Sequence, residues 1–118
     1  MLDISFSVVY YIQAMEDFVR QSLLFDFYGD LLTEHQKNIY GAYIQENLSL
    51  SEIAEDNGIS RQGVYDMTKR CRSILEEYEE KLHLVERFIS IRDRVEAINE
   101  AASLEEAKSI SKEILELL

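Results

Sequence analysis

The chain has 118 residues, with 23 Asp or Glu against 12 Lys or Arg, which gives a formal net charge of −11 at pH 7. This length suffices for one small domain with its own core, and a hydrophobic content of 47% is typical of a folded chain. The single cysteine, Cys71, excludes an internal disulfide and fits a reducing cytosol, and the two histidines, His35 and His83, are too distant in sequence to indicate a zinc site.

The absence of proline, together with abundant Glu, Leu, Ile and Ala, predicts an all-α fold. No run of about 18 apolar residues occurs, so we expect no membrane-spanning helix. Residues 1–14 combine β-branched and aromatic residues and lack the basic start of a secretory signal. We expect them to form an appendage to the domain, either a strand or a loose arm.

Apolar residues at helical spacing predict a first helix from about Glu16 to Leu32. A Thr33-Glu34-His35-Gln36 capping box predicts the start of a second helix, which runs to about Glu46. The side chains expected to face inward are Phe18, Leu23, Leu24, Phe27, Tyr28, Leu31 and Leu32 on the first helix and Ile39, Tyr40, Tyr43 and Ile44 on the second.

A second capping box, from Ser49 to Glu52, predicts a short third helix that ends at Asn57-Gly58. Ser60 is the predicted cap of a long fourth helix, whose apolar residues keep a three-four alternation as far as Phe88 or Ile89. This helix either continues to Ile98 or kinks near Ser90. A third capping box, Ser103 to Glu106, predicts a last helix that reaches Leu118.

The segment from Leu50 to Arg70, LSEIAEDNGISRQGVYDMTKR, has the residue pattern of a helix-turn-helix. Ala54 is small where the two helices would cross, Gly58 can take the left-handed conformation of the turn, and Val64 would contact the first helix. Ile53, Ile59 and Met67 complete the predicted core of the motif. The alternative is an ordinary pair of helices joined by a glycine turn.

If this motif docks on DNA, the start of its second helix faces the base edges. Arg61 could then pair with guanine and Gln62 with adenine, whereas Asp66 would lie unfavourably close to phosphates. The predicted base-facing residues are Ser60, Arg61, Gln62 and Tyr65, and the predicted phosphate contacts are Ser49, Ser51, Lys69, Arg70 and Arg72. The alternative for these side chains is a solvated face on which the cations pair with nearby glutamates.

Charge limits the affinity that this motif can have for DNA. Residues 60–72 hold Arg61, Lys69, Arg70 and Arg72 against Asp66, a local net charge of +3 in a chain of net −11. Phosphate attraction normally supplies much of the binding free energy, but at physiological salt the screening length is about 8 Å, so distant acids matter less than near ones. We therefore expect a weak binder, or one that acts as a dimer.

Catalysis has little support in the sequence. There is no glycine-rich phosphate loop, nucleophile elbow or metal-ligand spacing, so we expect neither an enzyme nor a bound metal or cofactor. The run of Glu76, Glu77, Glu79 and Glu80 is expected to be a solvated helix face, and Cys71 lies on the apolar stripe of its helix.

Three segments together, LLFDFYGDLLTEHQ, LSLSEIAEDNGISRQGVYDMTKR and LEEYEEKLHL, resemble the YlxM family of small bacterial proteins. The resemblance covers about Met15 to Phe88. It implies a helix-turn-helix similar to region 4 of sigma-70-type factors, in a bacterial cytoplasmic protein that is not an enzyme. It also implies a DNA-binding regulator that takes part in the signal recognition particle pathway. The family usually has alanine where Gly63 stands, which puts the regularity of the DNA-reading helix in question.

Two functions compete on this evidence, in a chain divided into the appendage 1–14, a helix-turn-helix domain 15–72 and an acidic helical extension 73–118. The first is a DNA-binding regulator that forms a homo-oligomer through the extension. The second is a protein adaptor of the signal recognition particle pathway, in which acidic helices contact a basic partner and no DNA is bound. Binding to the RNA of the particle is a third possibility with less support from the motifs.

Overall fold

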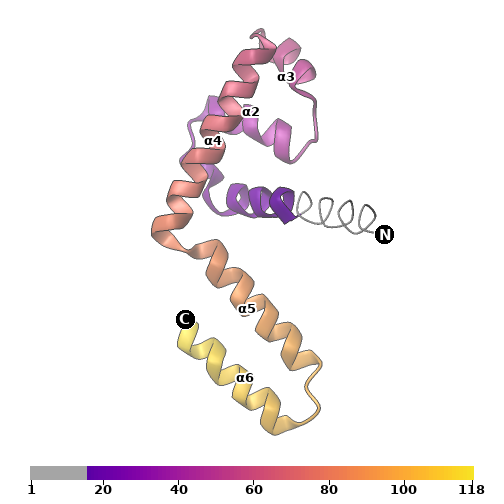
Figure 1. The fold of residues 1–118 in the computed structure, drawn as a ribbon, viewed down its shortest axis with the longest axis vertical. Coiled ribbons are helices and arrows are strands. Elements are labelled where there is room, and N and C mark those ends of the chain that lie inside the picture. Colours follow the sequence, from indigo (N-terminus) through magenta and orange to yellow (C-terminus); the bar gives the residue numbers. More distant parts are fainter. Residues whose placement is uncertain (1–15) are drawn as a thin grey trace, which may run out of the picture. The chain divides into compact units, whose positions relative to one another are not determined.

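The computed structural model describes residues 16–118, and the predicted appendage lies outside these residues. Residues 16–28 are helical, and no strand occurs between residues 16 and 118, which confirms the all-α prediction (Figure 1). The elements that follow are the 3-10 helix η1 Gly29–Leu31, then α2 Glu34–Ile44, α3 Leu50–Asn57, α4 Arg61–Leu82, α5 Leu84–Asn99 and α6 Leu104–Leu117. None of the described helices is long and apolar enough to cross a bilayer.

The chain divides into two compact units, one that ends at Glu80 and one that spans Lys81–Leu118. The sequence-based division placed the boundary after Arg72. In the structure, Leu75 and Glu79 are still buried in the first unit, so most of α4 belongs to the helix-turn-helix domain.

Side-chain caps mark the start of α2, α3, α4 and α6, as the sequence predicted. The Thr33 hydroxyl accepts a hydrogen bond of 3.2 Å from the Gln36 N–H, and the Gln36 side chain accepts one of 3.0 Å from the Thr33 N–H. Ser49 and Glu52 form the same reciprocal pair at the start of α3. At α6 only half of the predicted box forms, because the Glu106 carboxylate accepts from the N–H of Ala102 instead.

The predicted inward faces of the first two helices were partly wrong. Phe18, Phe27, Leu31 and Tyr43 are exposed by 39–54%, whereas Phe25, absent from the prediction, is buried. The helix also changes to 3-10 geometry at Gly29, before the predicted end at Leu32.

Two glycines explain why Phe25 is buried. A Cβ on Gly29 or on Gly41 would lie 3.2 Å from the ring of Phe25. The ring therefore packs closely against both backbones where neither residue has a side chain, and helical periodicity does not register this kind of fit.

The long helix breaks at His83, not near Ser90 as the alternation allowed. His83 has a positive φ of 56°, the left-handed conformation, which ends α4 at Leu82 and lets α5 begin at Leu84. The apolar alternation hides this break because the residues on either side continue the same spacing. Within the second unit, the His83 Nδ1 lies 3.2 Å from the Glu86 Oε2.

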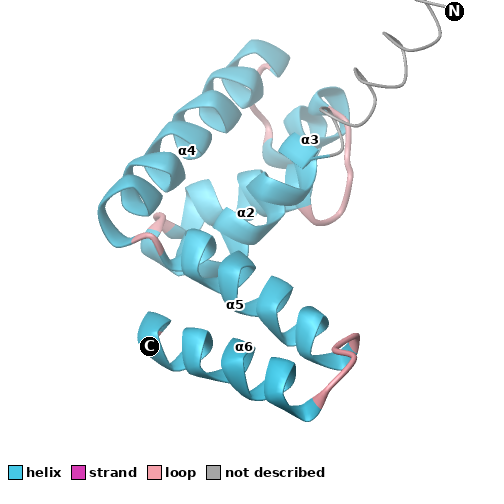
Figure 2. Ribbon diagram, turned by 60° about the horizontal axis from the view of Figure 1, so that its bottom comes forward, coloured by secondary structure: helices cyan, strands magenta, loops and turns pink. Residues whose placement is uncertain are grey.

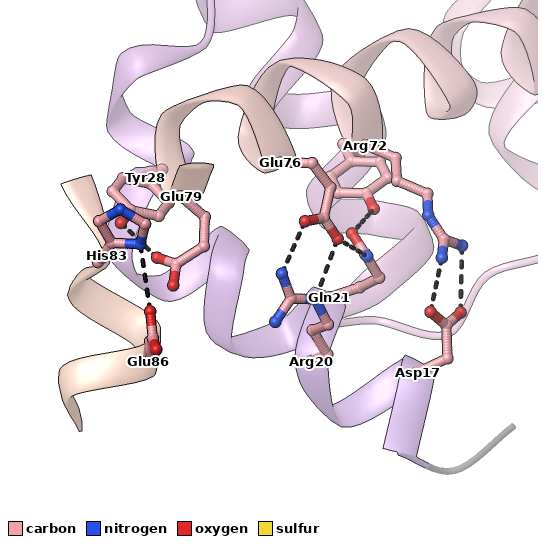
Figure 3. Close-up of polar contacts among 10 residues, drawn as sticks. Asp17, Arg20, Gln21, Tyr28, Arg72, Glu76, Glu79, His83 and Glu86 are labelled. Carbon is pink, nitrogen blue, oxygen red and sulfur yellow. Dashed lines mark hydrogen bonds and ion pairs between the residues drawn. The ribbon is translucent and has the colours of Figure 1, made fainter. Parts of the chain in front are cut away.

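Polar side chains hold the first helix against α4 (Figure 3). The Tyr28 hydroxyl donates to the Glu79 Oε1 at 2.6 Å, and both side chains are buried. One turn away, the Arg20 guanidinium donates to both Glu76 oxygens at 3.1 and 2.7 Å, and the Gln21 amide adds a third donor at 3.1 Å. The hydrogen bond from Arg20 is the main reason why the pKa of the Glu76 carboxyl is lowered.

These contacts correct the prediction that the glutamate run of α4 is a solvated face. Glu76 and Glu79 bind the first helix, and only Glu77 and Glu80 are exposed. A helix can place residues three apart on its packed side and their neighbours in solvent, and charge alone does not separate the two sets.

The second unit is a pair of helices, α5 and α6, that lie side by side (Figure 2). An ion pair joins them, with the Arg94 Nε 3.3 Å from the Glu113 Oε2. No residue of α6 is buried. Large apolar side chains of the pair therefore remain exposed, among them Phe88, Val95, Leu104, Leu115 and Leu118.

Removing the Tyr28 hydroxyl should destabilise the first unit. Tyr28→Phe leaves the buried Glu79 without one donor, so we expect a loss of about 1–3 kcal/mol in the free energy of unfolding, measured by urea denaturation. Tyr78→Phe is the matched control, because its ring stacks on that of Tyr28 and its hydroxyl makes no hydrogen bond to the described residues. Equal losses in the two variants would contradict a specific role for the Tyr28–Glu79 bond.

Candidate nucleic-acid interface

The helices α3 and α4 pack through the residues that the helix-turn-helix pattern predicted. Ile53 and Val64 have no exposed surface and Ala54 only 8%, and they form one cluster with Ile39 of α2. Ile59 and Met67 are partly buried against that cluster. The α2 helix thus contributes to this cluster, and it also packs directly against α3.

A left-handed residue makes the turn between the two helices. Gly58 has φ 65° and ψ 30°, and its N–H donates to the carbonyl of Ala54. The Ile59 N–H donates to the same carbonyl at 3.1 Å, which closes the turn and directs the Ile59 side chain into the cluster. A Cβ on Gly58 would meet no atom within 4 Å, so the need for glycine is conformational and not steric.

Ser60 caps α4, and its hydroxyl accepts a hydrogen bond of 3.0 Å from the Gly63 N–H. A Cβ on Gly63 would lie 3.1 Å from the Ser60 Oγ. The glycine thus stands in the first turn beside the cap, where it leaves room for the hydroxyl, and not in the helix interior where its cost would be largest.

Five predicted DNA-binding residues share one exposed side of α4. With 3.6 residues per turn, they fall within an arc of roughly 100° around the helix axis. We call them the recognition face: Arg61, Gln62, Tyr65, Lys69 and Arg72. The arrangement presents three cations, an amide and an aromatic ring in one strip along the helix.

Two hollows in the surface accompany this strip. One, of about 500 Å³, is lined by Leu50, Arg61, Gln62 and Tyr65. The other, of about 600 Å³, reaches from Tyr65, Lys69 and Arg72 to Asp17 and Phe18 on the first helix. Leu50 and Tyr65 line both hollows, and the first helix contributes Asp17 and Phe18 to the larger one.

The other predicted contacts lie elsewhere. Arg70 is exposed but stands roughly 100° around the axis from Lys69, beyond the recognition face. Ser49 and Ser51 are exposed at the start of α3, and the Ser49 and Ser60 hydroxyls both act as helix caps. The sequence analysis placed all of these residues in one set of DNA contacts. The helix period shows that Arg70 faces a different side of α4 from the recognition face.

Several side chains of the recognition face already have partners. The Gln62 Nε2 donates to the Asp66 Oδ1 at 3.0 Å, and the Lys69 Nζ lies 5.2 Å from the centre of the Tyr65 ring. Arg72 is bound by Asp17 through two hydrogen bonds. Arg61 forms no hydrogen bond or ion pair with the described residues, so its guanidinium is available to a ligand.

The described residues offer neither a reactive cysteine nor a metal site. Cys71 is buried, and burial raises the pKa of its thiol to about 11, so it is a packed side chain and not a nucleophile. Among residues 16–118 no group of three or more His, Cys, Asp or Glu side chains could hold a metal ion.

The helix-turn-helix geometry of α3 and α4 agrees with the family to which this chain is similar. A family model described as "Putative helix-turn-helix protein, YlxM / p13 like" (UPF0122) matches residues 15–115. The chain belongs to this family. A UPF0122 protein of Clostridium kluyveri is 48% identical over 84 residues, which cover 71% of this chain and 76% of the relative.

Two other UPF0122 proteins show that the likeness extends over most of the chain. The protein of Thermoanaerobacter sp. is 43% identical over 103 residues, or 87% of this chain and 88% of its own. That of Shouchella clausii is 44% identical over 89 residues, or 75% and 82% of the two chains. The UPF0122 match therefore includes α5 and α6 as well as the helix-turn-helix.

Replacing Gly58 should test the turn of this UPF0122 protein. Alanine in the left-handed conformation costs roughly 1–2 kcal/mol, and asparagine tolerates it better. We therefore expect Gly58→Ala to lower the free energy of unfolding by about 1–2 kcal/mol and Gly58→Asn to lower it less, both measured by urea denaturation. If Gly58→Ala were as stable as the parent protein, the left-handed turn would not exist in solution.

Proposed function

We propose that this UPF0122 protein is a DNA-binding regulator that reads duplex DNA with the recognition face of α4. The observation that carries the proposal is the exposed first turn of α4, which presents Arg61 and Gln62 on a helix braced by the α3–α4 core. Helix-turn-helix proteins insert this part of the second helix into the major groove.

The chemistry of the first turn suits base edges. A free guanidinium such as that of Arg61 can donate two parallel hydrogen bonds to guanine. Gln62 gives one amide hydrogen to Asp66, which leaves its second amide hydrogen and its carbonyl oxygen for an adenine. Asp66 thereby orients the Gln62 amide toward the base. This contact assigns a role to a carboxylate that would otherwise only oppose DNA binding.

We also propose that the protein works as a homo-oligomer in the bacterial cytoplasm. The exposed apolar side chains of α5 and α6 support this proposal, because a two-helix unit of this size buries little of its own surface. Two copies would double the number of phosphate contacts, which a chain of net charge −11 needs. Participation in the signal recognition particle pathway is proposed from the sequence resemblance.

Selection from a random duplex pool tests DNA reading. We expect the parent protein to enrich a sequence, and Arg61→Ala or Gln62→Ala to lose about 1–3 kcal/mol of discrimination at one base pair each, measured by fluorescence anisotropy on the selected duplex. Arg87→Ala in the second unit is the charge-matched control, and it should change the affinity far less. If the parent protein enriches no sequence and binds no tighter than micromolar at low salt, the DNA-reading proposal fails.

A protein-adaptor role remains the competing proposal, because Glu77 and Glu80 present exposed negative charge on α4. Glu76 and Glu79 bind the first helix, so reversal of all four glutamates would disturb the fold. Glu77→Lys with Glu80→Lys is the informative variant. If cells that carry this variant lose the activity of the protein while cells that carry Arg61→Ala keep it, the result favours the adaptor over the DNA-binding regulator.

The oligomer is tested by light scattering of the full chain at high concentration. We expect a mass of at least two chains, and Leu115→Gln should lower it because Leu115 is 68% exposed on α6. Lys112→Gln, on the same helix, is the control and should leave the mass unchanged. A parent protein that stays monomeric would contradict the proposed oligomer.

A further inference from the structure

We propose that Asp17 sets the affinity of the recognition face, because its carboxylate neutralises Arg72 and thereby withholds one cation from DNA phosphates. The inference rests on the proposed DNA binding and adds to it a residue from a different helix. Asp17 has no place in the helix-turn-helix pattern, and it lies 55 residues from Arg72 in the chain.

The contact is a two-pronged ion pair (Figure 3). The Arg72 Nη1 donates to the Asp17 Oδ2 at 3.1 Å, and the Nη2 donates to the Oδ1 at 2.6 Å. Both terminal nitrogens of the guanidinium therefore point at the carboxylate. These are the nitrogens that a phosphate would otherwise use for its own two-pronged contact.

The pair stands on the surface that DNA would cover. Asp17 and Arg72 line the same hollow as Tyr65 and Lys69 of the recognition face, and their side chains are 47% and 49% exposed. A phosphate that approached Arg72 in this hollow would therefore meet a neutral ion pair in place of a cation.

The fold does not depend on this pair. An exposed ion pair contributes little to stability. The first helix is already held to α4 by the buried Tyr28–Glu79 bond and by the contacts of Arg20 and Gln21 to Glu76. The main effect of Asp17 is therefore electrostatic: of the three cations on the recognition face, only Arg61 and Lys69 keep their full attraction for phosphates.

This arrangement makes binding depend on sequence. Phosphate contacts attract every duplex equally, whereas Arg61 and Gln62 would distinguish base pairs. With one phosphate contact suppressed, occupancy of random DNA falls, and the regulator relies on the base-edge contacts to stay bound.

Asp17→Asn tests the inference through the salt dependence of DNA binding. Releasing Arg72 to a phosphate should steepen the slope of log affinity against log salt by about 0.9, so roughly threefold more affinity is lost between 50 and 200 mM NaCl than in the parent protein. At low salt the gain in affinity should be equal on the selected duplex and on a random one. Fluorescence anisotropy titrations measure both.

Three further variants separate this effect from net charge and from folding. Asp26→Asn removes the same charge from the opposite side of the first helix, roughly 180° around its axis, and should leave the slope unchanged. The double variant Asp17→Asn with Arg72→Gln should return to the parent slope, because the gain requires Arg72. Asp17→Glu keeps the charge and should give the parent slope. A changed slope in Asp17→Asn alone then follows from the lost charge and not from a folding defect at this position.

Each result decides the inference. If the parent protein binds DNA but Asp17→Asn has an unchanged slope, or Asp26→Asn steepens it equally, the inference is overturned and the proposed function stands. If the double variant keeps the steeper slope, Arg72 is not the released cation and the inference is likewise overturned. If neither the parent protein nor Asp17→Asn binds DNA, both the inference and the proposed function fail.

Discussion

The first unit depends on how the first helix is anchored to α4. The small core between α3 and the first turns of α4 cannot hold the whole length of α4 in place, so α4 needs a further support. The buried Tyr28–Glu79 hydrogen bond and the Arg20–Glu76 ion pair provide it, and both use carboxylates on the packed side of α4. The acidity of this helix is therefore partly structural, since two of the carboxylates that contribute to the net charge of −11 hold the first helix in place.

The same anchoring defines the surface that the protein presents. Because the first helix lies along α4, it brings Asp17 and Phe18 to the edge of the hollow that Lys69 and Tyr65 also line. The surface around the recognition face is consequently built from two distant parts of the chain, the first helix and α4. The charge that this surface presents is therefore set by the whole unit and not by the helix-turn-helix alone.

Local signals in the sequence predicted much of the fold. The caps at Thr33 and Ser49 and the left-handed Gly58 depend on residues within a few positions of one another, so single-chain patterns reveal them. The core of the motif, from Ile53 to Met67, follows from the same short-range geometry. The helix period also places the residues of the recognition face on one side of α4, once the start of that helix is known.

What the sequence did not reveal depends on contacts between distant residues or on a single backbone angle. The Asp17–Arg72 pair joins residues 55 apart, and the buried ring of Phe25 packs closely against glycines on two different elements. The break at His83 is one left-handed residue within an unbroken apolar alternation. Periodicity records which side chains are apolar and how they are spaced, but it does not record which partner reaches them.

The burial of Cys71 has a consequence for how the motion of this domain can be followed. The thiol has no exposed surface, and it lies on the packed side of α4 beside the backbone carbonyl of Gln36, at 3.9 Å. A thiol reagent can reach it only when the packing around this side of α4 opens. The rate of its modification therefore reports how often the core beneath the recognition face opens, without any introduced probe.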